Sequence, residues 1–123
     1  MEIGNIKFKA KRLDNGEWIE GTPICINGKP YGIMIGEKES PDIDPSTICQ
    51  FTGLKDCKGK EIWEHDLLQS QETKAIYEVV WNQGNTSFSL VNTEYPVLYP
   101  NTLGSMLRNR SLKVIGNKFD KKK

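Results

Sequence analysis

Long apolar runs are missing from the sequence, and their absence limits where the protein can act. No stretch approaches the roughly 20 apolar residues that a transmembrane helix requires, so we expect no membrane contact. The residues after Met1 lead straight into alternating charge rather than into the apolar segment of a signal peptide. These absences predict a cytoplasmic protein.

Cysteines are few, and histidine occurs once. The three cysteines, Cys25, Cys49 and Cys57, form an odd set, which fits reduced thiols better than a disulfide framework. Cys25 lies in an apolar stretch and is expected in the core, whereas Cys57 lies in a predicted turn and is expected at the surface. The chain is long enough to fold around a hydrophobic core without disulfides.

Catalytic motifs are absent as well. The sequence has no G-x-S-x-G elbow, no Walker loop and no G-x-G-x-x-G fingerprint. His65 lies between Glu64 and Asp66, but acid–base catalysis needs a positioned partner and a substrate pocket, and zinc needs several ligands. We therefore expect no catalytic residue, no metal, no cofactor and no enzymatic activity. A hydrolase whose residues meet from distant loops is the less favoured alternative.

An excess of charge is also missing. The 123 residues include 17 Lys or Arg and 16 Asp or Glu, which gives a net charge of +1. Dedicated nucleic-acid-binding proteins are usually far more basic, so the total charge does not favour that class. A balanced total can still hide a local basic patch.

What the sequence does contain is a series of short two-faced stretches separated by turns. Ile6, Phe8 and Ala10 alternate with lysines, and this period of two predicts a half-buried strand. The Asn-Gly pairs at 15–16 and 27–28 stand between such stretches and predict hairpins, because both residue types tolerate a positive φ. The other expected strands cover residues 46–51, 75–81, 86–91 and 111–115.

Four other segments are expected to be less regular. Thr102 can cap a short helix over residues 102–108, and residues 61–66 are interpreted as one helical turn. Residues 36–45, rich in charge, Gly and Pro, predict a loop and a sub-boundary within the domain. Residues 118–123 are expected to form a disordered basic tail.

Many short strands with regular turns predict a mainly β fold. We expect short antiparallel strands and hairpins that form a barrel or a sandwich, with at most one or two short helices. A small SH3-like barrel is one form that this pattern allows. The length fits a single domain over residues 1–123.

Three stretches resemble a known family. Residues 44–56 and 59–66, which read DPSTICQFTGLKD and GKEIWEHD, are the most specific, and residues 6–18 and 113–117 flank them in the expected order. On these motifs the chain resembles the YopX-type proteins of phages and prophages. The resemblance implies a mostly β fold, a phage or prophage origin and a homo-oligomer, and it carries over no catalytic residue. The family usually has Gly where Cys49 and His65 stand here.

Lysines form two groups beside aromatic residues. One group lines a side of the first predicted strand, and the other surrounds a predicted turn next to Trp63. Such groups can bind single-stranded nucleic acid through phosphate contacts and base stacking. They can equally be a solvated sheet face on which lysines guard an edge against aggregation. The two groups are Lys7, Lys9 and Lys11, and Lys55, Lys58 and Lys60.

The sequence therefore leaves two hypotheses of different classes. The first is a phage or prophage accessory protein that acts by protein–protein contact, as a non-enzymatic homo-oligomer with an unknown partner. The alternative is a small nucleic-acid-binding β-barrel module that uses the lysine–aromatic surface, which the balanced charge does not favour.

Overall fold

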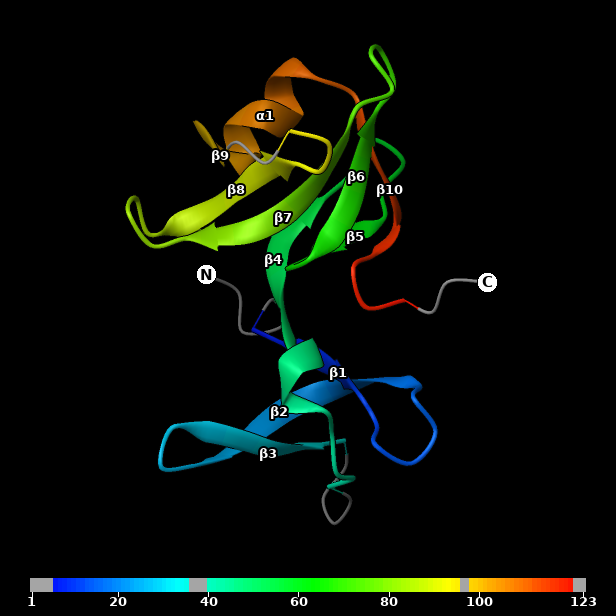
Figure 1. The fold of residues 1–123 in the computed structure, drawn as a ribbon, viewed down its shortest axis with the longest axis vertical. Coiled ribbons are helices and arrows are strands. Elements are labelled where there is room, and N and C mark those ends of the chain that lie inside the picture. The colour runs from blue at the N-terminus through cyan, green and yellow to red at the C-terminus, as the bar shows by residue number, and fades with distance from the viewer. Residues whose placement is uncertain (1–5, 36–39, 96–97, 121–123) are drawn as a thin grey trace. The chain divides into compact units, whose positions relative to one another are not determined.

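A computed structural model describes residues 6–35, 40–95 and 98–120 (Figure 1). The chain divides into two compact units, residues 1–51 and 52–123, and each is described by itself. The division falls after residue 51, and the sub-boundary expected at residues 36–45 stays a prediction. Whether both units fold as one domain over residues 1–123 stays a prediction.

The first unit is built on hairpins. Its strands are β1 (Phe8–Lys11), β2 (Trp18–Ile26), β3 (Lys29–Met34) and the start of β4 (Cys49–Lys55). They belong to an antiparallel sheet with the order β3-β2-β1-β4-β5, in which β5 is Glu61–Trp63. Asn27 and Gly28 join β2 to β3 with φ values of 51° and 77°, which is the tight turn that the Asn-Gly pair predicts.

The core of the first unit includes a residue from the predicted loop. Ala10, Ile33 and Ile43 form a buried cluster, against which Ile19 and Ile48 pack. Ile43 is held there by a bridge to Arg12, while the neighbouring Asp42 bridges to Gly32 of β3. Residues 40–45 thus include part of the core, and residues 36–39 lie outside the described residues.

The second unit contains a five-stranded antiparallel sheet with the order β10-β6-β7-β8-β9, and it also contains β5 and one α-helix (Figure 1). Its elements are β5 (Glu61–Trp63), β6 (Asp66–Ser70), β7 (Ile76–Asn82), β8 (Ser87–Asn92), β9 (Leu98–Thr102), α1 (Leu103–Asn109) and β10 (Leu112–Asn117).

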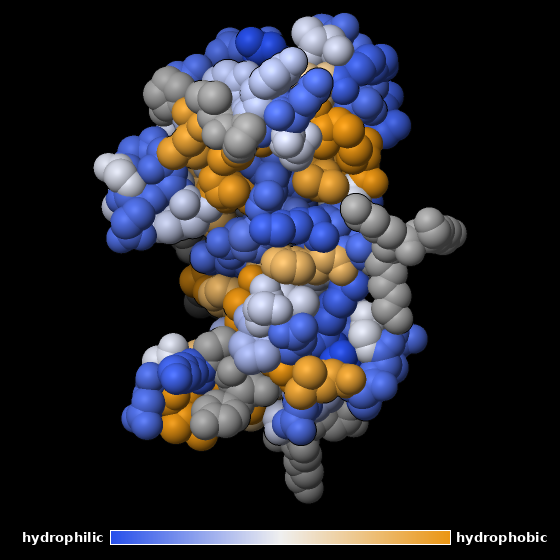
Figure 2. All heavy atoms as spheres, viewed as in Figure 1, coloured by the Kyte–Doolittle hydropathy of each residue, from blue (hydrophilic) through white to orange (hydrophobic). Residues whose placement is uncertain are grey.

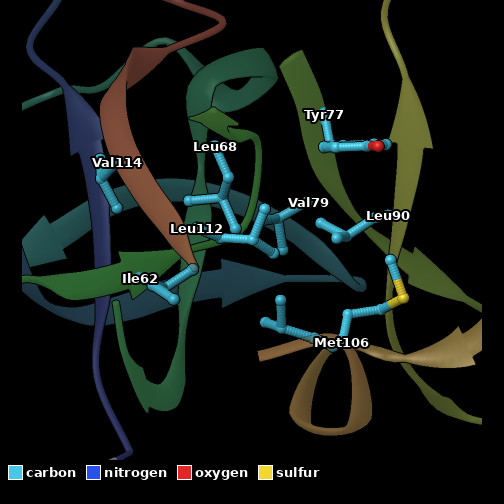
Figure 3. Close-up of a cluster of buried hydrophobic side chains, with 9 residues drawn as sticks. Ile62, Leu68, Tyr77, Val79, Leu90, Met106, Leu112 and Val114 are labelled. Atoms are coloured by element: carbon cyan, nitrogen blue, oxygen red, sulfur yellow. The ribbon is translucent and has the colours of Figure 1, made fainter. Parts of the chain in front are cut away.

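Alternating side chains of this sheet build the larger core. Leu68, Val79, Leu90 and Leu112 are fully buried and point toward one another (Figure 3). Full burial of each such side chain contributes roughly 1.5–3 kcal/mol to stability. The strands and helix also contribute Ile62, Tyr77, Leu103, Met106 and Val114.

Helix α1 begins where the sequence predicts. The Thr102 hydroxyl accepts a hydrogen bond from the Ser105 backbone N–H at 3.2 Å, so Thr102 is the N-cap. Leu103 and Met106, three residues apart, are buried in the core. The helix therefore covers the core side of the sheet through its apolar stripe.

The mainly β fold is confirmed, with refinements. The described strands form two open antiparallel sheets and no closed barrel. Residues 61–66 are not a helical turn, because 61–63 form β5 and Asp66 begins β6. Cys25 is exposed and not in the core, whereas Cys57 is exposed as expected.

The described part of the expected tail is hydrogen-bonded. Lys118 donates its backbone N–H to the His65 carbonyl at 2.9 Å. Phe119 and Asp120 form backbone and side-chain hydrogen bonds with Asn117. Residues 118–120 therefore continue the fold beyond β10, and residues 121–123 lie outside the described residues.

Candidate functional site

The lysines of the first strand lie over aromatic rings. Lys9 Nζ is 4.6 Å from the centroid of the Trp18 ring, and Lys11 Nζ is 5.4 Å from the same ring. Lys7 Nζ is 4.6 Å from the centroid of the Phe51 ring. These distances lie within the roughly 6 Å over which a cation is attracted to a ring face. We call Lys7, Lys9 and Lys11 the lysine row.

Strand pairing explains why the row and the indole share a face. Lys11 is directly opposite Trp18 and Lys9 is opposite Glu20 on β2, and paired residues of antiparallel strands point to the same side. The alternate residue Ala10 points the other way, into the core. The period of two in the sequence thus places the lysines on one face, together with Trp18 and the buried Cys49, and Ala10 on the other.

The aromatic ring expected beside the second lysine group is buried. Lys55, Lys58 and Lys60 are exposed around the turn after β4. Trp63 is only 5% exposed, so its ring is not offered to a base. This group belongs to the second unit, and the lysine row to the first.

The turn itself is organised by Asp56. Its carboxylate accepts backbone hydrogen bonds from Lys58, Lys60 and Val114 at 2.8–2.9 Å. Burial raises the pKa of Asp56, but these hydrogen bonds favour the ionised form and hold the pKa below its ordinary value overall. The arrangement is structural, because all three donors belong to the protein backbone.

His65 lies in a turn among charged groups. Its Nδ1 is 2.9 Å from Glu78 Oε2, and its Nε2 is 3.8 Å from Glu64 Oε2. The imidazole also contacts the Phe119 ring edge-on at a centroid distance of 5.3 Å, and Lys118 Nζ is 4.0 Å from Glu78. The sequence alone places Glu64 beside His65. Glu78 lies in β7 and comes close to His65 only through the fold. No group of three metal-ligating side chains occurs among the described residues.

The side of the second unit's sheet that points away from the core carries both aliphatic and polar residues. Core residues of β6, β7 and β8 alternate with outward-pointing residues, among which Gln69, Glu78 and Ser89 are polar. We call this side the outer face, and its aliphatic members are Leu67, Ile76, Val80, Val91 and Leu98. Leu98 is 44% exposed, the other four are half-buried, and Ser89 on the same face is fully buried.

The outer face was missed at the level of sequence. The sequence signal for it is the nearly continuous apolar run at 76–81. A strand that is buried on one side alternates apolar and polar residues, whereas a strand with apolar residues on both sides does not. Figure 2 shows apolar surface interspersed with hydrophilic surface on the side of the molecule that it displays. An outer face of this kind is a place where another protein surface can pack.

A small pocket lies in the first unit. It has a volume of about 260 Å³ and is lined by Arg12, Leu13, Asp14, Pro41 and Asp42. Arg12 donates two hydrogen bonds to Asp14, at 3.0 and 2.7 Å, and this contact lowers the pKa of the Asp14 carboxyl. The volume is below the roughly 300–1,000 Å³ of typical ligand sites.

No helix within the described residues has the length and apolar character needed to cross a membrane.

Comparison with known proteins gives one family. A search of curated proteins found no match. The model of the YopX protein family matches residues 7–122, nearly the whole chain. This match agrees with the resemblance carried by residues 44–66, and the chain therefore belongs to the YopX family.

Proposed function

We propose that this protein is a phage or prophage accessory protein that acts by protein–protein contact in the cytoplasm of a bacterial host, and that it is not an enzyme. It forms a homo-oligomer through the outer face of the second unit. The observation that carries this proposal is the set of aliphatic side chains on the outer face, where Val91 lies directly opposite Leu98 and Leu98 is exposed.

The ionisable groups support a structural role over a catalytic one. The carboxyls Asp56 and Glu72 have lowered pKa values because backbone N–H groups bond to their ionised forms, and the pKa of Asp14 is lowered by Arg12. A general acid or base at neutral pH would need a pKa moved toward 7. In the 260 Å³ pocket, Arg12 and Asp14 form an ion pair with each other. A pocket whose charged groups are paired in this way gives the hydrolase alternative little support.

The charges beside the outer face favour a second copy as its occupant. A two-fold interface places the same patch on both subunits, so the patch must complement itself. Glu78 lies between Leu67 and Val91 on this face, and Lys118 Nζ lies 4.0 Å from its carboxylate. A face that combines aliphatic area with both signs of charge can meet a copy of itself without like-charge repulsion.

Pairing through the sheet edges has less support than pairing through the face. On the β10 edge, Val114 N–H donates to Asp56 and the Leu112 carbonyl accepts from Cys57. On the β9 edge, Pro100 has no N–H to offer an added strand. Both edges are thus poorly suited to strand addition.

The oligomeric state tests the proposal. Light scattering after size-exclusion chromatography should give a mass above that of one chain, with a concentration-dependent equilibrium. Leu98→Glu and Val80→Glu should shift the mass toward the monomer, because they bury a charge in the interface. Ile26→Glu in the β2–β3 hairpin is the matched control, since Ile26 is exposed in the other unit.

Two results would count against the proposal. A wild-type monomer at the highest soluble concentration removes the oligomer. An oligomer that both glutamate variants leave intact, with folding verified by circular dichroism, assigns the contact to another surface.

A further inference from the structure

We infer that the lysine row and Trp18 form a binding site for single-stranded nucleic acid on the first unit. The site is separate from the outer face, and the inference does not depend on the proposed self-association. It rests on three cations and one indole that strand pairing places on one face.

The spacing of the cations suits an extended polyanion. Alternate residues of a strand are about 6.6 Å apart, so the backbone positions of Lys7, Lys9 and Lys11 follow one line. The ammonium groups of Lys9 and Lys11 meet over the Trp18 ring, and that of Lys7 lies over Phe51. A single strand with unstacked bases can run along such a line, with successive phosphates near successive lysines.

The aromatic rings prepare the site for binding. Trp18, the first residue of β2, is half-buried, and the ammonium groups of Lys9 and Lys11 lie over its ring. The same ammonium groups cover the ring, so a base can stack on the indole, as on single-strand-binding surfaces, once a phosphate draws one of them away.

Glu20 sets the strength of the site. It is directly opposite Lys9 on β2, so a carboxylate shares the face with the cations. Because Glu20 lies beside the cations and the net charge is only +1, nucleic acid is attracted by the lysine row and not by the protein surface as a whole. The site therefore predicts weak binding that is strongly sensitive to salt.

Salt titration measures the footprint. For a fluorescent oligothymidylate of about 12 nucleotides, anisotropy should show binding at low salt. Three phosphate contacts give a slope of log K against log salt of about −2, from roughly −0.7 per contact on a single strand. Lys9→Gln should reduce the magnitude of the slope by about 0.7, and the triple variant of Lys7, Lys9 and Lys11 to Gln should abolish binding.

Variants with opposite signs separate binding from folding. Glu20→Gln should tighten binding, since it removes the carboxylate opposite Lys9. Lys58→Gln is the matched control in the second lysine group and should leave binding unchanged, because the nearby Trp63 ring is buried. In a Trp81→Phe background, bound bases should quench Trp18 fluorescence, while Trp63 stays buried.

Several results would overturn the inference. They are no binding at about 20 mM salt, an equal loss from Lys58→Gln and Lys9→Gln, or no change with Glu20→Gln. Equal affinity for a duplex of the same length would remove the single-strand assignment, because paired bases cannot stack on Trp18. Thermal melting of each variant confirms that any loss of binding is not a loss of folding.

Discussion

Asp56 accepts a hydrogen bond from the Val114 backbone N–H at 2.8 Å, across 58 residues of chain. The same carboxylate accepts from Lys58 and Lys60 within its own turn. One side chain therefore closes the turn after β4 and fixes that turn to β10, within the second unit. This relationship makes Asp56 a critical polar residue for the stability of that unit.

Asp56→Ala should lower the free energy of unfolding by about 3 kcal/mol, because it leaves backbone donors without their acceptor in a buried place. Urea denaturation followed by tryptophan fluorescence measures the change. Lys58→Ala, at an exposed position of the same turn, should change stability by less than about 0.5 kcal/mol. Equal losses in the two variants would contradict the role assigned to the carboxylate.

The same carboxylate predicts loss of stability in acid. Burial raises the pKa of Asp56, and the three backbone hydrogen bonds lower it further than burial raises it, so the folded pKa is below the unfolded one. The unfolded state then binds more protons in acid, and stability falls as pH decreases. The contribution is complete above the unfolded pKa of about 3.9 and is lost as pH falls through the folded pKa.

Urea titrations at a series of pH values between neutral and strongly acidic would measure this slope. Asp56→Asn removes the titrating group and should flatten the dependence below about pH 4. A variant whose stability falls with pH as steeply as the wild type would show that other carboxyls dominate. Glu72, whose pKa is lowered by bonds from Ser111 and Ser70, is the next group to test.

His65 should be more tolerant of Gly than of Ala. Its φ is 69°, in the left-handed region, where a Cβ is strained and Gly is not. Both substitutions lose the contacts with Glu78 and Phe119, so their difference isolates the backbone term. We expect His65→Gly to exceed His65→Ala in stability by about 1 kcal/mol.

The control for this comparison is a strand position of ordinary conformation. At exposed Lys113 in β10, Gly should be less stable than Ala, because Gly loses more backbone entropy on folding. The same order at both positions would mean that the backbone at His65 is not strained.

The three thiols should react at different rates. Cys25 and Cys57 are exposed, whereas Cys49 is fully buried with its Sγ 3.2 Å from the Thr47 carbonyl oxygen. A thiol-reactive chromophore should therefore modify two cysteines quickly in the native protein and the third only after denaturation. Cys49→Ala should leave the native count at two. A native count of three in the wild type would contradict the burial of Cys49.

Local signals predicted most of the fold. The Asn27–Gly28 turn and the Thr102 N-cap each depend on residues that are close in sequence. Both can therefore be predicted from the sequence alone. Strand β5 was missed because three residues are too few to show a period. Cys25 was misplaced because alternation predicts which residues share a face and not whether that face is covered; Ile26 beside it is 54% exposed.

The candidate sites divide in the same way. The lysine row follows from the period of two in β1, and its register with Trp18 follows from the hairpin between them. The burial of Trp63 and the contact between His65 and Glu78 depend on pairing between distant strands. Such contacts are set by tertiary packing, which short-range patterns do not specify.

Two buried serines should respond in opposite ways to the loss of a hydroxyl. Ser70 Oγ donates to Glu72 Oε2 at 2.9 Å and accepts from the Thr73 backbone N–H at 3.2 Å. Ser89 Oγ, on the neighbouring part of the same sheet, has no hydrogen-bond partner among the described residues. Both side chains are fully buried, so they differ in hydrogen bonding and not in exposure.

Ser70→Ala should lower the free energy of unfolding by about 1.5 kcal/mol, since it leaves Thr73 N–H without its acceptor. Ser89→Ala should be neutral or stabilising by up to about 1 kcal/mol, because it removes a buried polar group that gains no compensating bond. Parallel urea denaturation of the two variants measures the contrast. A loss at Ser89 as large as that at Ser70 would mean that the Ser89 hydroxyl is satisfied in solution, and the outer face around it would then be more polar than its aliphatic side chains imply.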